Sequence, residues 1–168
     1  RLKFYISYSI IGNHIRMGCL QTMMISTKGR YALRVMIDLA SQEPPRAYVP
    51  LKEITQRQNI STKYLESILS VLVKSGLVVG IRGKGGGYRL TKSPEEYTVG
   101  SILKLTEGSL APVSCLHPNS TGCERQEACP TLPMWRKLDQ IIDEYFEGIT
   151  LRDLIDEAKE GGFGNCVL

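Results

Sequence analysis

The feature that most constrains the fold is a pair of helical segments joined by a very short turn. In the stretch VPLKEITQRQNISTKYLESILSVLVKSGLV, hydrophobic periodicity predicts a short helix over residues 51–58 and a longer helix that opens at Ser61. Asn59 and Ile60 form the turn, and Gly76 suits the position just after the second helix. Two helices connected this closely predict a helix-turn-helix.

The second helix of this pair has two contrasting faces. The apolar face, which is predicted to be buried, contains Leu65, Ile68, Leu69, Leu72 and Val73. The polar face carries Lys63, Glu66, Ser67, Ser70 and Lys74. A helix with a single apolar side packs that side on the core and leaves the other side available to a ligand.

A glycine-rich basic segment, IRGKGGGYRL, follows the helix pair. The runs LVVGIR and GYRLT are β-prone and separated by glycines, which predicts a hairpin. A nucleotide-binding P-loop is the alternative, but that motif needs Ser or Thr after Gly-Lys and then a helix, whereas Gly85 follows Lys84 and a strand comes next. The hairpin is therefore predicted to be the wing of a winged helix.

Further helices are predicted on both sides of this unit. STKGRYALRVMIDLA forms a helix that Pro44-Pro45 terminates, Thr98 caps a helix that runs to about Glu107, and TLRD opens a last helix at Thr150. The first of these has Tyr31, Ala32, Val35, Met36, Leu39 and Ala40 on one face. The fold class is mainly α with a small β-hairpin wing: a winged helix-turn-helix DNA-binding domain followed by a long C-terminal dimerisation helix.

That long helix is predicted from an apolar stripe that recurs every three or four residues. The stripe consists of Trp135, Leu138, Ile141, Ile142, Tyr145, Phe146 and Ile149. Little chain remains to cover it, so we expect it to pack on a partner, with Trp135 to Phe146 in a dimer interface. The alternative is that the stripe folds back on its own winged helix.

Charge divides the chain into unlike halves. Residues 24–92 carry 12 basic and 4 acidic residues, whereas residues 93–168 carry 6 basic and 13 acidic ones. Such asymmetry indicates a nucleic-acid-binding portion joined to a portion with another role, although two solvated faces would give the same counts.

The domain division follows from these segments. Residues 23–92 form the winged helix-turn-helix domain, 93–134 a linking helix and cysteine-containing sensor loop, and 135–160 the dimerisation helix and C-terminal helix. Residues 1–22 are expected to be a disordered or spurious extension, and 161–168 a flexible tail. The apolar run near the start is too short for a membrane span and lacks a signal-peptide cleavage site, which predicts a cytoplasmic protein.

The cysteines give the second chemical signal. Cys115, Cys123 and Cys129 are spaced C-x7-C-x5-C, while Cys19 and Cys166 fall in the expected tails. The odd number of cysteines argues against a disulfide framework, and the spacing is not the C-x2-C typical of zinc knuckles. Three thiolates on one loop suit an iron–sulfur cluster, with reactive or structural thiols as the alternatives and His117 as a possible fourth ligand.

Several motifs occur together in one order: MISTKGRYALRVMIDLA, ISTKYLESILSVLVKSGLV, IRGKGGGYRL, the cysteine loop followed by ACPTLPMWRKL, and ITLRDL. Over about residues 23–154 the chain resembles the IscR, NsrR and CymR family of bacterial winged-helix transcription regulators. The resemblance implies a homodimer on a pseudo-palindromic operator, with a [2Fe-2S] or [4Fe-4S] cluster held by the three cysteines of the loop. Members that regulate cysteine metabolism typically lack this cysteine triplet.

The resemblance does not supply a fourth ligand. A histidine three residues after the last cysteine serves in the iron–sulfur biogenesis regulators, and here that position is Leu132. An acidic residue of the other subunit, near the N-terminus, serves in the nitric-oxide sensors, and here the matching position is about Arg30. The ligand therefore stays open among His117, Glu107, Glu124 and Glu127.

DNA contacts are expected from two places. The start of the second helix of the pair presents backbone amides and polar side chains to a groove, and Arg82 and Lys84 on the wing reach or flank a minor groove. The expected DNA-binding residues are Lys28, Arg30, Tyr31, Ser61, Thr62, Lys63, Tyr64, Glu66, Ser67, Arg82, Gly83 and Lys84.

The sequence thus predicts a DNA-binding transcription regulator, a repressor, that senses iron–sulfur, redox or nitrosative status and is not an enzyme. Two alternatives remain: a regulator that uses its thiols or zinc without a cluster, and a cysteine-dependent redox enzyme. The enzyme is disfavoured because no catalytic base accompanies the thiols and His117 is the only histidine near them.

Overall fold

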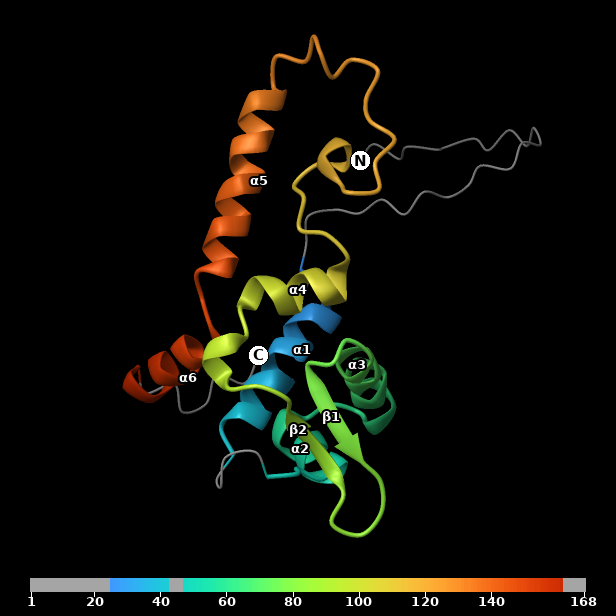
Figure 1. Ribbon diagram of the computed structural model, residues 1–168, viewed down its shortest axis with the longest axis vertical. Helices are drawn as coiled ribbons and strands as arrows, with labels where there is room; N and C mark the ends of the chain where they lie inside the picture. Colours follow the sequence, from blue (N-terminus) through green and yellow to red (C-terminus); the bar gives the residue numbers. More distant parts are fainter. Residues whose placement is uncertain (1–24, 43–46, 162–168) are drawn as a thin grey trace, which may run out of the picture.

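The computed structural model describes residues 25–42 and 47–161. Its elements are α1 (Thr27–Ala40), α2 (Leu51–Gln58), α3 (Thr62–Lys74), β1 (Val78–Ile81), β2 (Gly87–Leu90), a 3-10 turn η1 (Pro94–Glu96), α4 (Val99–Glu107), a 3-10 turn η2 (Ser114–Leu116), α5 (Leu132–Glu147) and α6 (Leu151–Glu160). The mainly helical fold class with one hairpin is confirmed (Figure 1). Pro44, Pro45, Cys19 and Cys166 lie outside the described residues.

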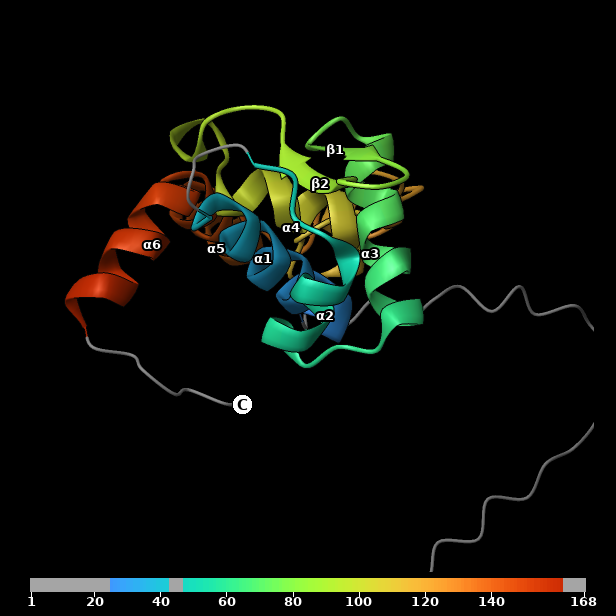
Figure 2. The same cartoon turned by 90° about the horizontal axis from the view of Figure 1, so that it is seen from below.

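α1 is the central element of the body. It contacts α2, α3, β2, α4 and α6, and Figure 2 shows it between α3 and α6. The core has members from most of these elements: Ala32, Val35, Met36 and Leu39 of α1, Ile54, Ile60, Leu65, Ile68, Leu69 and Leu72 of the helix pair, Val49, Val78 and Leu90 of the hairpin region, and Tyr97, Ile102 and Leu151. α4 and α6 therefore complete the hydrophobic core of the winged helix.

Local capping sets the ends of the helix pair. Asn59 adopts a left-handed conformation with φ 51° directly after α2, and the Ser61 hydroxyl accepts a hydrogen bond from the Tyr64 amide at the start of α3. At the other end Gly76 has φ 76°, its amide donates to the Val73 carbonyl, and the Leu77 amide donates to the Leu72 carbonyl. This pattern ends α3 and turns the chain directly into β1.

The hairpin is tied to the body at its base. β1 and β2 pair antiparallel with Val78 opposite Leu90 and Ile81 opposite Gly87. The buried Tyr97 hydroxyl donates to the Leu77 carbonyl at 2.9 Å and accepts hydrogen bonds from the backbone amides of Thr91 and Lys92. The base is thus fixed while the tip projects from the body.

One predicted core position is wrong. Val73 shares the apolar face of α3 in the sequence pattern, but its side chain is 40% exposed. The reason is that Val73 lines an open hollow between α3 and the hairpin instead of the closed core.

α5 extends away from the body (Figure 1), and Ile141 and Tyr145 of its apolar stripe are exposed. It begins at Leu132, three residues before the stripe, and ends at Glu147, before Ile149. Leu132 is its single buried residue among those described, while Met134, Ile141 and Tyr145 are 55%, 48% and 63% exposed.

Within residues 25–42 and 47–161, no helix has the length and apolar character needed to span a membrane.

Candidate DNA-binding surface and cysteine loop

The start of α3 is open to solvent and carries most of the expected DNA-binding side chains. Ser61, Thr62 and Lys63 are exposed in the first turn, and Glu66 and Ser67 are exposed one turn later. The amides of a helix N-terminus favour an anion such as a phosphate, and no acidic side chain lies in the first turn of α3. The Ser67 hydroxyl donates to the Tyr64 carbonyl at 2.6 Å, so it must rotate away before it can donate to a base.

Tyr64 differs from its neighbours because it is half-buried against α1. Its ring packs edge-to-face on Tyr31, with centroids 5.9 Å apart, and Arg34 lies over the Tyr31 ring at 5.1 Å. Tyr31 and Tyr64 therefore position the start of α3 against α1 as well as facing the surface. Lys28 and Arg30 lie in the first turns of α1, with Arg30 exposed.

A polar network that the sequence reading missed joins α1 to the end of α2. Arg57 donates to both oxygens of the buried Asp38 carboxylate, at 2.8 and 2.9 Å, and Gln58 donates to the same group. Arg34 donates to the Gln58 side chain at 3.1 Å and to its backbone carbonyl at 2.8 Å. The hydrogen bond with Asp38 is the main factor that raises the pKa of Arg57.

This network fixes the corner of the helix-turn-helix. Arg34 satisfies a carbonyl that the end of α2 leaves free, directly before the turn at Asn59. The signal in the sequence was the acidic Asp38 inside the apolar run of α1, because a buried carboxylate requires a partner.

The wing tip has the open, basic character that the sequence predicts. Arg82, Gly83, Lys84 and Gly85 are all exposed, and both glycines have positive φ, 101° and 77°. The Gly86 amide closes the turn on the Gly83 carbonyl at 3.0 Å, and a Cβ at Gly86 would lie 2.3 Å from the Ile81 carbonyl oxygen. Glycine is therefore required for the turn itself.

The joint between the body and α5 is held by charged side chains. Glu147 at the end of α5 accepts from the Thr98 hydroxyl at 2.6 Å and from Lys104 at 2.8 Å, and Lys104 also pairs with Asp143. Hydrogen bonds to these carboxylates raise the pKa of Lys104, and the hydrogen bond from Lys104 lowers that of Glu147. A Cβ at Gly100 would lie 2.7 Å from the Glu147 carboxylate, so glycine lets α4 and α5 approach closely.

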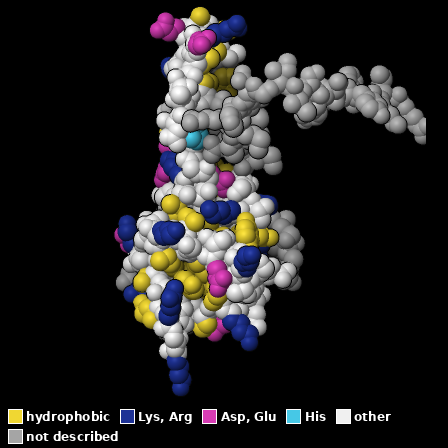
Figure 3. Space-filling view, turned by 90° about the vertical axis from the view of Figure 1, so that its right-hand side faces the viewer, with side chains coloured by type: hydrophobic (Ala, Val, Ile, Leu, Met, Phe, Trp, Pro, Cys, Tyr) yellow, Lys and Arg dark blue, Asp and Glu magenta, His cyan; other side chains and the backbone are white. Residues whose placement is uncertain are grey.

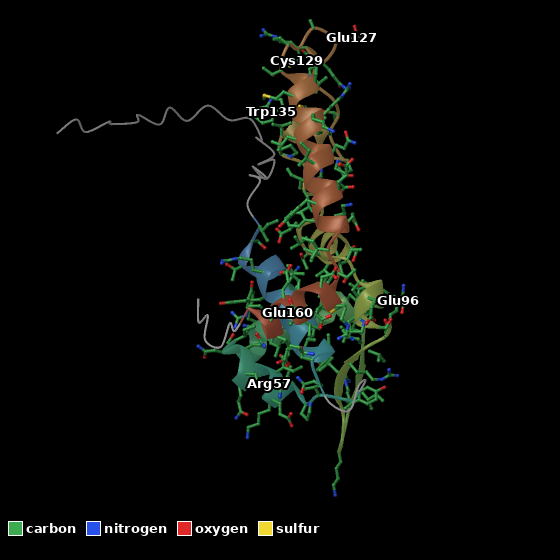
Figure 4. All side chains as sticks on the ribbon, turned by 90° about the vertical axis from the view of Figure 1, so that its left-hand side faces the viewer. Arg57, Glu96, Glu127, Cys129, Trp135 and Glu160 are labelled. Carbon is green, nitrogen blue, oxygen red and sulfur yellow. The ribbon has the colours of Figure 1, made fainter. Side chains whose placement is uncertain are left out.

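The three cysteines lie on the loop between α4 and α5. All three are free; Cys123 is exposed and the other two are half-buried. Figure 4 shows Cys129 and Glu127 at the outer end of α5, far from Arg57 in the body. Among the described residues no three His, Cys, Asp or Glu side chains are grouped closely enough to hold a metal ion, so this conformation does not bring the cysteines together as a ligand set.

The candidate fourth ligands are in different situations. The His117 Nδ1 atom accepts the Asn119 amide at 3.1 Å, which leaves the proton of a neutral ring on Nε2, a buried atom with no hydrogen-bond partner among the described residues. In this conformation Nε2 has no lone pair to offer. Glu107 accepts from the Ser26 hydroxyl at 2.8 Å beside the start of α1, and Glu124 and Glu127 are exposed on the loop.

The surroundings of Cys129 favour the thiolate form of its side chain. A contact of 3.4 Å with the Thr131 hydroxyl and hydrogen bonds from backbone amides lower the pKa of its thiol. A lower pKa favours the form that binds metals and reacts with oxidants.

Comparison with known proteins agrees with this architecture. Residues 25–157 match the Rrf2 family, described as an iron-dependent transcriptional regulator. The HTH-type transcriptional regulator IscR of Pectobacterium carotovorum subsp. carotovorum (strain PC1) is 41% identical over 139 residues, which cover 82% of each chain. The protein of the same name from Aliivibrio salmonicida (strain LFI1238) is 41% identical over 135 residues, 79% of this chain and 77% of its own.

Solved structures give the same picture. CymR (YrzC), the global cysteine regulator of B. subtilis, superposes with a TM-score of 0.64 at 36% identity, over 79% of this chain and 96% of that one. T. potens IscR gives a TM-score of 0.64 at 34% identity, over 84% and 93%. These relatives are transcriptional regulators and not enzymes, which confirms the regulator and removes support for the redox enzyme. The chain belongs to the Rrf2 family of winged-helix transcriptional regulators.

Proposed function

We propose that this regulator is a cytoplasmic homodimeric repressor that binds a pseudo-palindromic operator and senses iron–sulfur, redox or nitrosative status through Cys115, Cys123 and Cys129. The observation that carries the proposal is the separation of two parts in one chain. A basic winged helix presents a reading helix and a wing, and a loop with three free thiols connects it to a helix whose apolar stripe is partly exposed.

The DNA-binding half rests on exposure and charge. The side chains at the start of α3 and at the wing tip are free to approach a duplex, and Figure 3 shows Lys and Arg side chains spread over the body. A protein that neutralises phosphates in this way loses affinity as salt rises. The residues named from the sequence, from Lys28 to Lys84, are the proposed contacts.

The dimer rests on the apolar stripe of α5. The side chains of Ile141 and Tyr145 are about half exposed or more, and Tyr145 also packs edge-to-face on Phe146 with ring centroids 5.5 Å apart. A second copy of α5 would cover this stripe and place two reading helices at a fixed separation, as a two-fold operator requires.

The sensor half rests on the donor set. Three thiols on one irregular, solvent-facing loop suit a thiolate-held iron–sulfur centre, and the lowered thiol pKa of Cys129 favours ligation. Such a cluster would supply a centre that oxidants and nitric oxide can alter. Since the three thiols are apart in this conformation, the loop must rearrange to bring them together. His117 would need to release the Asn119 amide before its Nε2 atom could bind a metal.

Ordering of the cysteine loop would affect DNA binding through the joint of α4 and α5. The loop starts at the end of α4 and ends at the start of α5, and Glu147 and Lys104 hold these two helices to each other. Ordering the loop would thereby change how α5 is presented to a second copy, and with it the separation of the two reading helices.

The decisive test is an anaerobic absorption spectrum with iron and sulfide assays on wild-type protein and Cys123→Ala, with Cys166→Ala as the matched control. We expect visible thiolate-to-iron bands in the wild type and in the control, and their loss in Cys123→Ala. A duplex selected from a random DNA pool by the wild-type protein should then bind with different affinity before and after cluster removal. A colourless wild-type protein after anaerobic reconstitution would overturn the cluster, and equal operator affinity in both states would overturn the switch.

A cluster-free thiol sensor is the second candidate. The lowered thiol pKa of Cys129 beside Thr131 favours it, because a thiolate is the form that oxidants attack. This candidate predicts a colourless protein whose operator affinity changes on mild oxidation and no longer does so in Cys129→Ser.

A further inference from the structure

A hollow of about 320 Å³ lies between α3 and the wing. Its walls come from two elements that the proposed DNA contacts also use: Leu69, Ser70 and Val73 from α3, and Ile81, Arg82 and Tyr88 from the hairpin. The lining also includes Glu66, one of the expected base-reading residues of α3.

Part of the lining is aliphatic and open to solvent. Val73 is 40% exposed and Ile81 is 52% exposed, on opposite walls. Gly80 keeps the space free, because a Cβ there would lie 3.0 Å from the Tyr88 ring. An exposed pair of large aliphatic side chains on a surface that binds a ligand needs an apolar counterpart.

Other lining residues are polar and carry both charges. Ser70 and the Tyr88 side chain offer hydroxyl groups, Arg82 is basic, and Glu66 is the one acidic residue in the lining. Glu66 lies at the end nearest the start of α3, where a cytosine amino group could pair with it. Figure 3 shows hydrophobic and basic side chains interleaved on the side of the body that includes α3.

We propose that this hollow seats one sugar-phosphate strand of the operator, with Val73 and Ile81 in contact with deoxyribose rings. This inference rests on the proposed DNA binding. A duplex that receives the start of α3 in its major groove and the wing in its minor groove must have one strand pass between the two elements. That strand presents charged oxygens on its outside and apolar ring carbons facing the grooves, which matches a lining that contains both charged and aliphatic side chains.

The consequence is a part of the operator affinity that does not depend on salt. Contacts with phosphates release counterions and give a salt slope, whereas burial of aliphatic carbon against a sugar releases none. Substitutions of the aliphatic lining residues should therefore weaken operator affinity without changing its salt slope, whereas substitution of Arg82 should change the slope.

The experiment is a salt titration of affinity for a duplex selected from a random DNA pool by the wild-type protein. We expect Val73→Ser and Ile81→Ser each to weaken binding roughly five- to tenfold at every salt concentration, from the loss of buried apolar area, with an unchanged slope. Arg82→Ala should instead reduce the slope by about 0.9. Val73→Ile, which keeps an aliphatic side chain, should retain wild-type affinity.

The outcomes separate this inference from the proposed function. If the wild-type protein selects no duplex, DNA binding itself fails. If it does and both serine variants bind as the wild type does, while thermal melts show them folded, the seat in the hollow is wrong. The last measurement uses a duplex with uracil in place of thymine. If the two serine variants bind this duplex as well as the wild type does, the contact is with thymine methyl groups and the deoxyribose assignment is wrong.

Discussion

The winged-helix body and α5 use hydrophobic side chains in opposite ways. In the body, apolar residues of α1, α3 and α4 meet in one core and most are fully buried. In α5, a helix of 16 residues with an equally clear apolar stripe, Leu132 is the single buried residue among those described. Both stretches have helical periodicity, so the pattern alone does not distinguish them.

An apolar stripe therefore indicates that some surface packs on it, but the pattern does not indicate which surface that is. The body needs no second chain to bury its apolar stripes, because these stripes pack on one another around α1. α5 meets the body near its C-terminal end through charged groups, Lys104 with Asp143 and Glu147, and Ile141 and Tyr145 of its stripe are exposed. The body should therefore respond to substitutions through its stability, and α5 through its association.

The largest effect is expected in the core of the body. Leu65→Ala truncates a fully buried side chain on the inner face of α3 and should lower the free energy of unfolding by about 3 kcal/mol. Ile141→Ala on α5 is the matched control, since it removes a side chain that is 48% exposed and should change the unfolding of the monomer by less than about 0.5 kcal/mol. Chemical denaturation at low protein concentration measures both. Equal losses of unfolding free energy in the two variants would contradict this difference between the body and α5.

The next effect concerns association through α5. Tyr145→Asp places a charge in the most exposed part of the stripe and should raise the dissociation constant of the dimer at least about 100-fold. Analytical ultracentrifugation gives the constant, and circular dichroism should show an intact body. A variant that dimerises like the wild type would mean that another surface joins the two copies.

A smaller effect is expected at the corner of the helix-turn-helix. Asp38→Asn keeps the size of the side chain but removes the charge that Arg57 and Gln58 share, and should cost about 2 kcal/mol of stability, with weaker operator binding as α2 and α3 lose their alignment. Glu53→Gln breaks only the exposed pair with Arg57 and should cost less than about 0.5 kcal/mol. If both variants behaved alike, the buried network would not hold the corner.

The smallest effect is pH dependence at the joint. The pKa of Glu147 is lowered by Lys104 and Thr98, so its stabilisation is present above the ordinary pKa of a glutamate and is lost as the pH falls through the lowered value. The pKa of Lys104 is raised, so its contribution is lost only at strongly alkaline pH. Since both side chains are partly exposed, the acid loss should be at most about 1 kcal/mol.

Unfolding curves as a function of pH test this point. Glu147→Gln should remove the extra acid sensitivity of the wild type, whereas Glu157→Gln, an exposed position on α6, should leave it in place. Identical pH profiles for the wild type and Glu147→Gln would show that the joint does not depend on this charge.

Local sequence patterns were sufficient to predict the helix pair, the hairpin and most of the element ends. Ser61, Thr98 and Thr150 cap helices as their positions predict, and Gly76 ends α3 with a positive φ. These features depend on residues a few positions apart, where hydrogen bonding and backbone preference act locally. For the same reason the wing tip, with its required glycines, could be identified before the fold was known.

Which surfaces meet depends instead on the three-dimensional arrangement of the chain. Val73 has the helical position of a core residue but lines an open hollow beside the hairpin, and Asp38 has the charge of a surface residue but is buried with Arg57 and Gln58. The three cysteines share a loop in the sequence, yet the described conformation keeps them apart. Burial and proximity depend on residues that are distant along the chain, and no local pattern of side chains encodes that distance.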